Sequence, residues 1–179
     1  MTRTQALARA TAAFQLRKQI TDDDVGIGLA IVAPNGKKFA ARLMWDVVYS
    51  AGFRWGDGDY FHWVPSPDTD VSQGIGMGGT STEAGYFMPE WVARNDGSAD
   101  VTDLEMSFNV ARTREPSAVF DVMVRAANNM ARRLGGTVVS VETGAPFDEK
   151  AVRAKLDSIV KAMTNARIKP GSSLALQVF

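Results

Sequence analysis

The feature that most limits what this chain can fold into is an apolar run, Val25 to Ala33, that stands between Asp22-Asp23-Asp24 and Pro34-Asn35-Gly36. An apolar run of this length that ends at a Pro-Asn-Gly turn predicts a well-buried strand. The uncharged stretch ends at Gly36 and is well short of the roughly 20 residues that span a bilayer. A domain built around a buried strand is therefore expected, with no membrane insertion by this chain.

The segments around this run alternate between helical and strand-like spacing. Helical spacing of apolar residues and capping signals predict helices over residues 4–20, 37–51, 116–134 and 148–163. Alternation and β-favouring composition predict strands over residues 59–64, 74–79, 101–110, 137–142 and 174–178. This order predicts an α+β fold in which helices cover one face of a mostly antiparallel sheet.

The strand over 101–110 indicates what the other face of the sheet looks like. Large apolar residues alternate there with polar ones, so that Leu104, Met106 and Phe108 point one way while Glu105 and Ser107 point the other. One face of the sheet is then buried and the other faces solvent, where such a fold can bind another molecule.

Charge and composition exclude several classes of function. The chain of 179 residues has 20 basic and 20 acidic residues, and its middle, residues 21–146, has 17 acidic against 10 basic residues. A phosphate-tracking groove needs clustered Lys and Arg, so no nucleic-acid partner is expected. With no cysteine and with His62 alone, disulfides, thiolate nucleophiles and multi-histidine metal sites are ruled out. The first residues lack the apolar block of a signal peptide, and we expect a cytoplasmic protein.

Three local patterns suggest chemistry, and each is better explained by structure. Gly74 to Gly79 fits G-x-G-x-x-G but has no helical pattern after it, so a bulged strand or loop is expected and no cofactor. Asp57, Asp59 and His62 lie close in sequence without further ligands, which favours turn-forming aspartates and no metal. An aromatic cluster predicts core and sheet surface; its members are Phe53, Trp55, Tyr60, Phe61 and Trp63. No base-activated nucleophile is present, so no catalytic residue is assigned.

From Val25 to Met163 the chain resembles one known family, the C-terminal FtsZ-binding domain of the bacterial cell-division protein ZipA. The resemblance is carried by short segments in the family order: Ala51-Gly52-Phe53-Arg54-Trp55-Gly56-Asp57, Tyr60-Phe61-His62, Gly85-Tyr86-Phe87-Met88-Pro89-Glu90, Phe108-Asn109-Val110, and Phe120 with Ala131 to Gly136. The closing strand and helix, Thr137 to Met163, fall at the family spacing.

The resemblance implies a six-stranded antiparallel sheet with three helices on one face, no catalysis and no cofactor. Residues 1–24 would form an N-terminal helical extension, residues 25–164 the ZipA-like domain, and residues 165–179 a C-terminal extension with an extra strand. In this family the exposed sheet face forms a shallow apolar groove for the C-terminal tail peptide of FtsZ. The peptide-binding residues implied for this chain are Val25, Ile27, Leu29, Tyr60, His62, Glu105 and Ser107.

Two other functions stay open at the level of sequence. Gly58, the Thr80–Ser81 region, Glu105 and Ser107 stand where family members carry larger apolar side chains. An adaptor, inhibitor or immunity-like protein that uses the same fold for another partner is therefore one alternative. A small carboxylate-dependent enzyme is the second, although no spacing among the 20 acidic residues singles out a catalytic pair.

Overall fold

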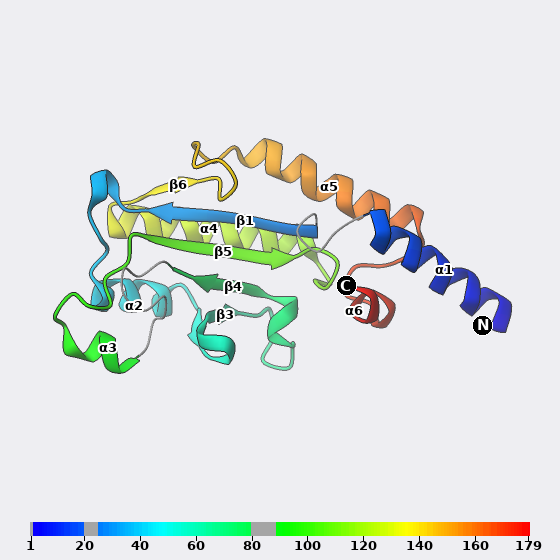
Figure 1. The fold of residues 1–179 in the computed structure, drawn as a ribbon, viewed down its shortest axis with the longest axis horizontal. Coiled ribbons are helices and arrows are strands. Elements are labelled where there is room, and N and C mark those ends of the chain that lie inside the picture. The colour runs from blue at the N-terminus through cyan, green and yellow to red at the C-terminus, as the bar shows by residue number, and fades with distance from the viewer. Residues whose placement is uncertain (1, 20–24, 80–88) are drawn as a thin grey trace.

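The computed structural model describes residues 2–19, 25–79 and 89–179, and Figure 1 shows its elements around one sheet. The strands are β1 (Gly26–Val32), β2 (Arg54–Trp55), β3 (Phe61–Trp63), β4 (Ile75–Gly78), β5 (Asp103–Asn109) and β6 (Thr137–Val139). The helices are α1 (Arg3–Gln19), α2 (Ala41–Ser50), α3 (Pro89–Arg94), α4 (Pro116–Leu134), α5 (Glu149–Asn165) and α6 (Ser173–Val178). Short 3₁₀ turns occupy Pro34–Gly36, Asp57–Asp59 and Val71–Gln73.

The six strands form one sheet in the order β2-β3-β4-β5-β1-β6, and every neighbouring pair is antiparallel. The predicted α+β class and the six-stranded sheet are therefore confirmed. The apolar run that opens the sequence becomes β1, which pairs with β5 along its whole length and with β6 at one end. Four of its seven residues, Ile27, Leu29, Ala30 and Ile31, are buried.

One face of the sheet is covered by helices and carries the core. In register across β3, β4, β5 and β1 lie Phe61, Met77, Met106 and Leu29, and all four are fully buried. Helix α4 packs on β1 and β6, and α2 packs beside α4. Pro116 opens α4 and Gly135 closes it in the left-handed conformation with φ 73°, as the sequence predicts.

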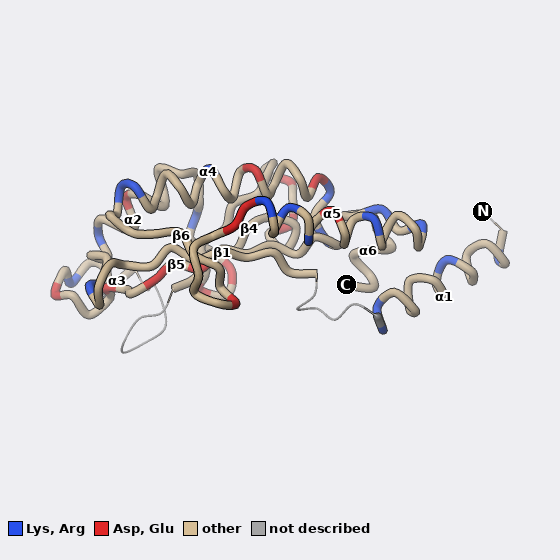
Figure 2. Tube along the Cα trace, turned by 90° about the horizontal axis from the view of Figure 1, so that it is seen from above, with Lys and Arg blue, Asp and Glu red and all other residues tan. Residues whose placement is uncertain are grey.

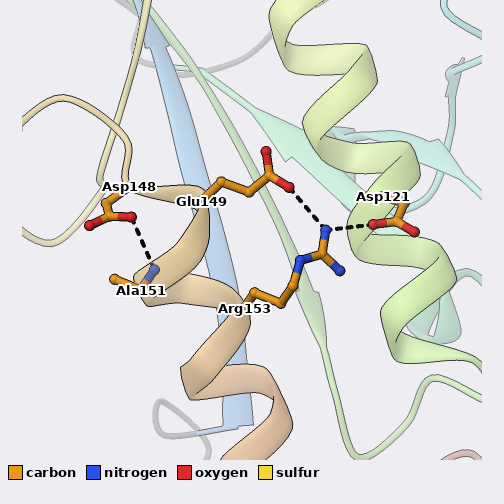
Figure 3. A network of polar contacts seen from close by, with 5 residues as sticks. All are labelled: Asp121, Asp148, Glu149, Ala151 and Arg153. Atoms are coloured by element: carbon orange, nitrogen blue, oxygen red, sulfur yellow. Dashed lines mark hydrogen bonds and ion pairs between the residues drawn. The ribbon is translucent and has the colours of Figure 1, made fainter.

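Helix α5 is fixed at its first turns by polar contacts (Figure 3). The Asp148 carboxylate accepts a hydrogen bond from the Ala151 N–H at 3.0 Å, which is the predicted N-cap. One turn later the Arg153 guanidinium donates to Asp121 of α4 at 2.7 Å and to Glu149 at 3.0 Å. The two carboxylates, through these hydrogen bonds, raise the pKa of Arg153, which stays charged. These contacts link α5 to α4 on the outer side of the helical layer.

The two terminal segments pack on each other at one end of the molecule. Figures 1 and 2 show α1 projecting from that end, with α6 beside it. The predicted strand over 174–178 is wrong, since these residues form helix α6. Ser172 caps it by accepting from the Ala175 N–H, and Leu174 and Val178, four residues apart, pack together against the core.

Several other boundaries differ from the sequence prediction. The strand predicted over 137–142 ends at Val139, because residues 141–143 form a turn. The helix predicted over 37–51 begins at Ala41, because Phe39 forms a β-bridge with Val101 instead. The strand predicted over 59–64 begins at Phe61, because a positive φ of 60° at Asp59 completes the preceding turn. The Thr80–Ser81 region and Gly85 to Met88 lie outside the described residues.

Candidate functional site

The second face of the sheet carries the residues that alternate with the core side chains. His62, Gly76, Ser107 and Gly28 lie in register across β3, β4, β5 and β1, one position along from the buried row. Because successive side chains of a strand point to opposite faces, this row faces away from the core. The row thus consists of one histidine, one serine and two glycines.

The space above the sheet differs from one glycine to the next. A Cβ placed on Gly76 would meet no heavy atom within 4 Å, and one on Gly28 would meet its nearest neighbour, the Met106 carbonyl oxygen, at 3.3 Å. At Gly78 the situation differs, because an added Cβ would lie 2.6 Å from Cε1 of the Tyr60 ring. Tyr60 therefore covers Gly78 and forms one wall, while the row through Gly76 is open.

Three residues of this row, His62, Gly76 and Ser107, form the floor of a groove of about 470 Å³. Its lining residues come from β1, β3, β4, β5 and the turns that precede β3 and β4: Gly26, Asp57, Gly58, Tyr60, His62, Val71, Ser72, Gly74, Gly76, Ser107, Phe108 and Asn109. A second hollow of about 330 Å³ shares Gly26 and continues along Gly28 toward the start of α5. Among the described residues, none of α1 or α6 lines either hollow, so the terminal helices leave this groove uncovered.

His62 is held at the edge of the groove by the turn that precedes β3. Its Nε2 lies 2.7 Å from the carbonyl oxygen of Asp57, so Nε2 carries the hydrogen and donates it. Its Nδ1 is buried and has no hydrogen-bond partner among the described residues. The ring is thus fixed in one orientation, with its edge toward the groove floor.

A polar cluster closes the end of the groove near the start of β4. The Ser72 hydroxyl donates to the Asp70 carboxylate, and Ser72 Oγ accepts from Arg112 Nε at 3.1 Å and Nη2 at 2.9 Å. The hydrogen bonds from the Ser72 hydroxyl and the Ser72 N–H lower the pKa of Asp70, and the charge of Arg112 adds to the effect. Asp70 is therefore a carboxylate at neutral pH and fixes Ser72 in place.

The structure corrects part of the predicted binding set. Val25, Ile27 and Leu29 are between 0% and 2% exposed, because they point into the core, and the prediction that they line an exposed groove is wrong. Tyr60, His62, Glu105 and Ser107 lie together on the open face, and their part in binding stays a prediction.

The groove floor itself was missed from sequence, although a signal was present. In Gly26–Leu29 glycine alternates with large apolar residues. Since the large residues must face the helices, the glycines had to face the open side. The same parity holds for Ile75, Gly76 and Met77.

The structure also shows where the residues lie that suggested cofactor binding, metal binding and an aromatic cluster. Gly74 to Gly79 runs along β4 and is not a strand-to-helix turn, so it lacks the geometry of a dinucleotide site. Within residues 2–19, 25–79 and 89–179 no group of three or more His, Asp or Glu side chains could hold a metal ion. The aromatic cluster splits: Phe53 and Phe61 are fully buried, Trp55 packs on Trp45 with ring centroids 5.6 Å apart, and Tyr60 alone is largely exposed.

Comparison with known families agrees with this geometry. The model of the ZipA C-terminal FtsZ-binding domain matches residues 26–157, more than two thirds of the 179-residue chain. The chain belongs to the ZipA C-terminal domain family. The match begins at the first residue of β1 and ends within α5, so the ZipA-like part contains the whole sheet and leaves out α1 and α6.

Two further findings concern this ZipA-like chain, one from a second comparison and one from its helices. A search of the curated proteins finds no match. Of the helices in the described ranges, none combines the length and the apolar character needed to cross a membrane.

Proposed function

We propose that this ZipA-like chain binds a short peptide in the groove on the open sheet face, and that the C-terminal tail of FtsZ is its partner. The observation that supports the proposal most is the groove floor at Gly76, where an added Cβ would meet no heavy atom within 4 Å, while none of the described residues of α1 or α6 lines the groove. The family supports an FtsZ-binding module that acts in cell division.

Because the groove floor has no side chain at its glycine, the peptide and not the protein supplies most of the side-chain atoms in contact there. Where the floor has no side chains, the groove is filled by side chains of the ligand, and the ligand backbone can come close to the sheet. Tyr60 and Val71, 50% and 36% exposed, supply apolar walls. Each large apolar side chain that a peptide buries here contributes on the order of 1.5–3 kcal/mol. An amphipathic peptide with two or three such residues fits these requirements.

The polar groups of the groove fix the orientation of the peptide. Ser107 and Asn109 of β5 offer hydroxyl and amide groups along one side of the floor, and His62 stands opposite Ser107 across Gly76. A few convergent polar groups in an otherwise smooth site favour one direction of binding over the other. The groove therefore has the elements of a specific peptide site.

The test is to titrate the purified chain with a synthetic FtsZ tail peptide and to measure binding by isothermal titration calorimetry. Gly76→Leu places a side chain in the empty space of the floor and should weaken binding at least tenfold. Ala154→Leu adds the same exposed bulk on α5, outside the residues that line the groove, and should bind like the wild type. Both variants should keep the wild-type circular dichroism spectrum.

Two results would contradict the proposal in different ways. If the wild type shows no binding at about 1 mM peptide, which corresponds to only about −4 kcal/mol, the FtsZ tail is not the partner. If binding occurs but Gly76→Leu and Ala154→Leu bind equally well, the peptide lies elsewhere on the molecule.

One observation favours a second candidate, a protein partner other than FtsZ. Glu105 projects from the open face between Gly78 and Ala30, and Asp57 lines the groove nearby, so acidic groups stand beside the floor. Such a face favours a peptide with basic residues. Glu105→Gln would weaken binding of a basic partner and leave a purely apolar contact unchanged.

A further inference from the structure

Another cavity, distinct from the groove and from the hollow along Gly28, lies on the side of β3 and β4 opposite to the groove. It has a volume of about 310 Å³, and its apolar walls are Trp63, Pro65 and, on α4, Ala118, Val119 and Val122. His62 and Trp63 are consecutive, as are Ser72 and Gln73. In each pair the first residue lines the groove and the second lines this cavity. We call this cavity the Gln73 pocket; it has no lining residue in common with the groove.

The pocket contains one polar side chain whose acceptor is unused. Gln73 is only 9% exposed, and its Oε1 is buried without a hydrogen-bond partner among the described residues. Buried polar atoms in folded proteins are nearly always paired, so an unpaired one needs an explanation. A molecule that donates a hydrogen bond to Oε1 would satisfy this acceptor.

The groups around Gln73 cannot supply the missing hydrogen bond. The Gln73 N–H donates to the Asp70 carbonyl at 2.9 Å, and the Gln73 carbonyl accepts from Thr113 Oγ1 at 3.2 Å. The same Thr113 hydroxyl donates to the Asn109 carbonyl at 2.8 Å, so its single hydrogen is already shared. The backbone groups of Gln73 and the Thr113 hydroxyl are thus already paired, and the Gln73 Oε1 is left without a donor among the described residues.

Volume and charge limit what that molecule can be. Small-molecule sites range from about 300 to 1,000 Å³, so this pocket fits a ligand of about one fused ring system. Arg114 and Glu115, adjacent in sequence, both line the pocket and carry opposite charges. Because these charges offset each other, the pocket favours an uncharged ligand. Trp63 offers an aromatic surface on which a flat ring can pack.

We propose that the Gln73 pocket binds a small uncharged aromatic molecule with a ring N–H that donates to Gln73 Oε1. A carboxamide turns readily about its last side-chain bond, which brings Oε1 to the pocket when a donor arrives. Indole has this size and this single donor. The site is independent of the groove and of its peptide.

The first experiment compares indole with indene, which has the same shape but no N–H. Protein-observed NMR should show saturable shifts at Trp63 and Val122 with indole, and binding of indene about tenfold weaker. In Gln73→Leu the two compounds should bind equally, because the acceptor is gone. Equal affinity of the wild type for both compounds would overturn the role of Gln73, and no saturable shift with indole would overturn the proposal.

The second experiment places the ligand with a matched pair of variants on α4. Ala118→Phe fills the pocket and should abolish the indole shifts, whereas Ser117→Phe adds the same ring at an exposed neighbour that does not line the pocket. Indole binding that survives Ala118→Phe would contradict the assignment, as would shifts at His62 and Ser107 in place of Trp63. Neither result depends on whether the FtsZ tail binds the groove.

Discussion

Two adjacent rows of residues across the same four strands have opposite characters. Phe61, Met77, Met106 and Leu29 form the covered row, and each is fully buried under the helices. Its neighbour on the open face is His62, Gly76, Ser107 and Gly28, where two of four positions have no side chain. Most of the hydrophobic stabilisation of the sheet therefore comes from the covered face. On the other face Ala30 and Val139, which pair with each other, are also buried.

The largest expected effect contrasts neighbours on β5. Met106→Ala creates a cavity between the sheet and the helices and should lower the free energy of unfolding by about 2–5 kcal/mol. Ser107→Ala removes an exposed hydroxyl on the other face and should change it by less than about 0.5 kcal/mol. Urea denaturation followed by circular dichroism measures both. Similar losses in the two variants would show that the faces do not divide stability and binding as described.

Gly74, just before β4, and Gly76, within β4, test the comparison between two nearby glycines. A Cβ on Gly74 would lie 2.1 Å from the carbonyl oxygen of Trp63, whereas one on Gly76 has nothing within 4 Å. Gly74→Ala should therefore cost about 1–3 kcal/mol of unfolding free energy, since the backbone of β3 would have to move. Gly76→Ala should be neutral or stabilise by up to about 1 kcal/mol, because alanine reduces the entropy of the unfolded chain. Thermal denaturation of the two variants measures both changes in stability. A larger loss of stability for Gly76→Ala than for Gly74→Ala would contradict the expected order.

The smallest expected effect concerns pH at the polar end of the groove. Hydrogen bonds from Ser72 hold the pKa of Asp70 below its ordinary value near 3.8 in the folded chain. A carboxyl whose pKa is lowered by folding stabilises the fold above its unfolded pKa, and this contribution is lost as the pH falls through the lowered folded value. Ser72→Ala should raise the pKa of Asp70 toward 3.8, which an NMR titration of the side-chain carboxyl measures. If the pKa of Asp70 is the same in Ser72→Ala and in the wild type, the Ser72 hydroxyl does not lower the pKa of Asp70.

Much of the sheet could be predicted because its signals are local. Alternation in Leu104–Val110 gave the correct buried face of β5, and Pro116 and Gly135 marked both ends of α4. The terminal strand failed for a physical reason. Leu174, Leu176 and Val178 fit a two-residue alternation, but Leu174 and Val178 also fit one helical turn, and the Ser172 cap decides for the helix.

The candidate site was predicted only in part, because the facing of β1 was assigned to the wrong side. Ile27 and Leu29 are apolar and suit an apolar groove, so their chemistry alone did not distinguish the groove from the core. The requirement that helices need large apolar contacts on their side of the sheet does distinguish them. The Gln73 pocket could not be predicted, because Trp63, Gln73 and Ala118 come from three separate segments that meet only at the walls of this cavity in the folded chain.

The bare positions at Gly28 and Gly76 have a consequence for how this protein can change over time. A recess that exists because side chains are missing can only lose depth, since every replacement of glycine adds atoms to it. In a groove lined by large side chains, single substitutions can make the groove deeper, shallower or different in shape. At Gly76, where nothing lies within 4 Å of an added Cβ, any substitution therefore makes the groove shallower.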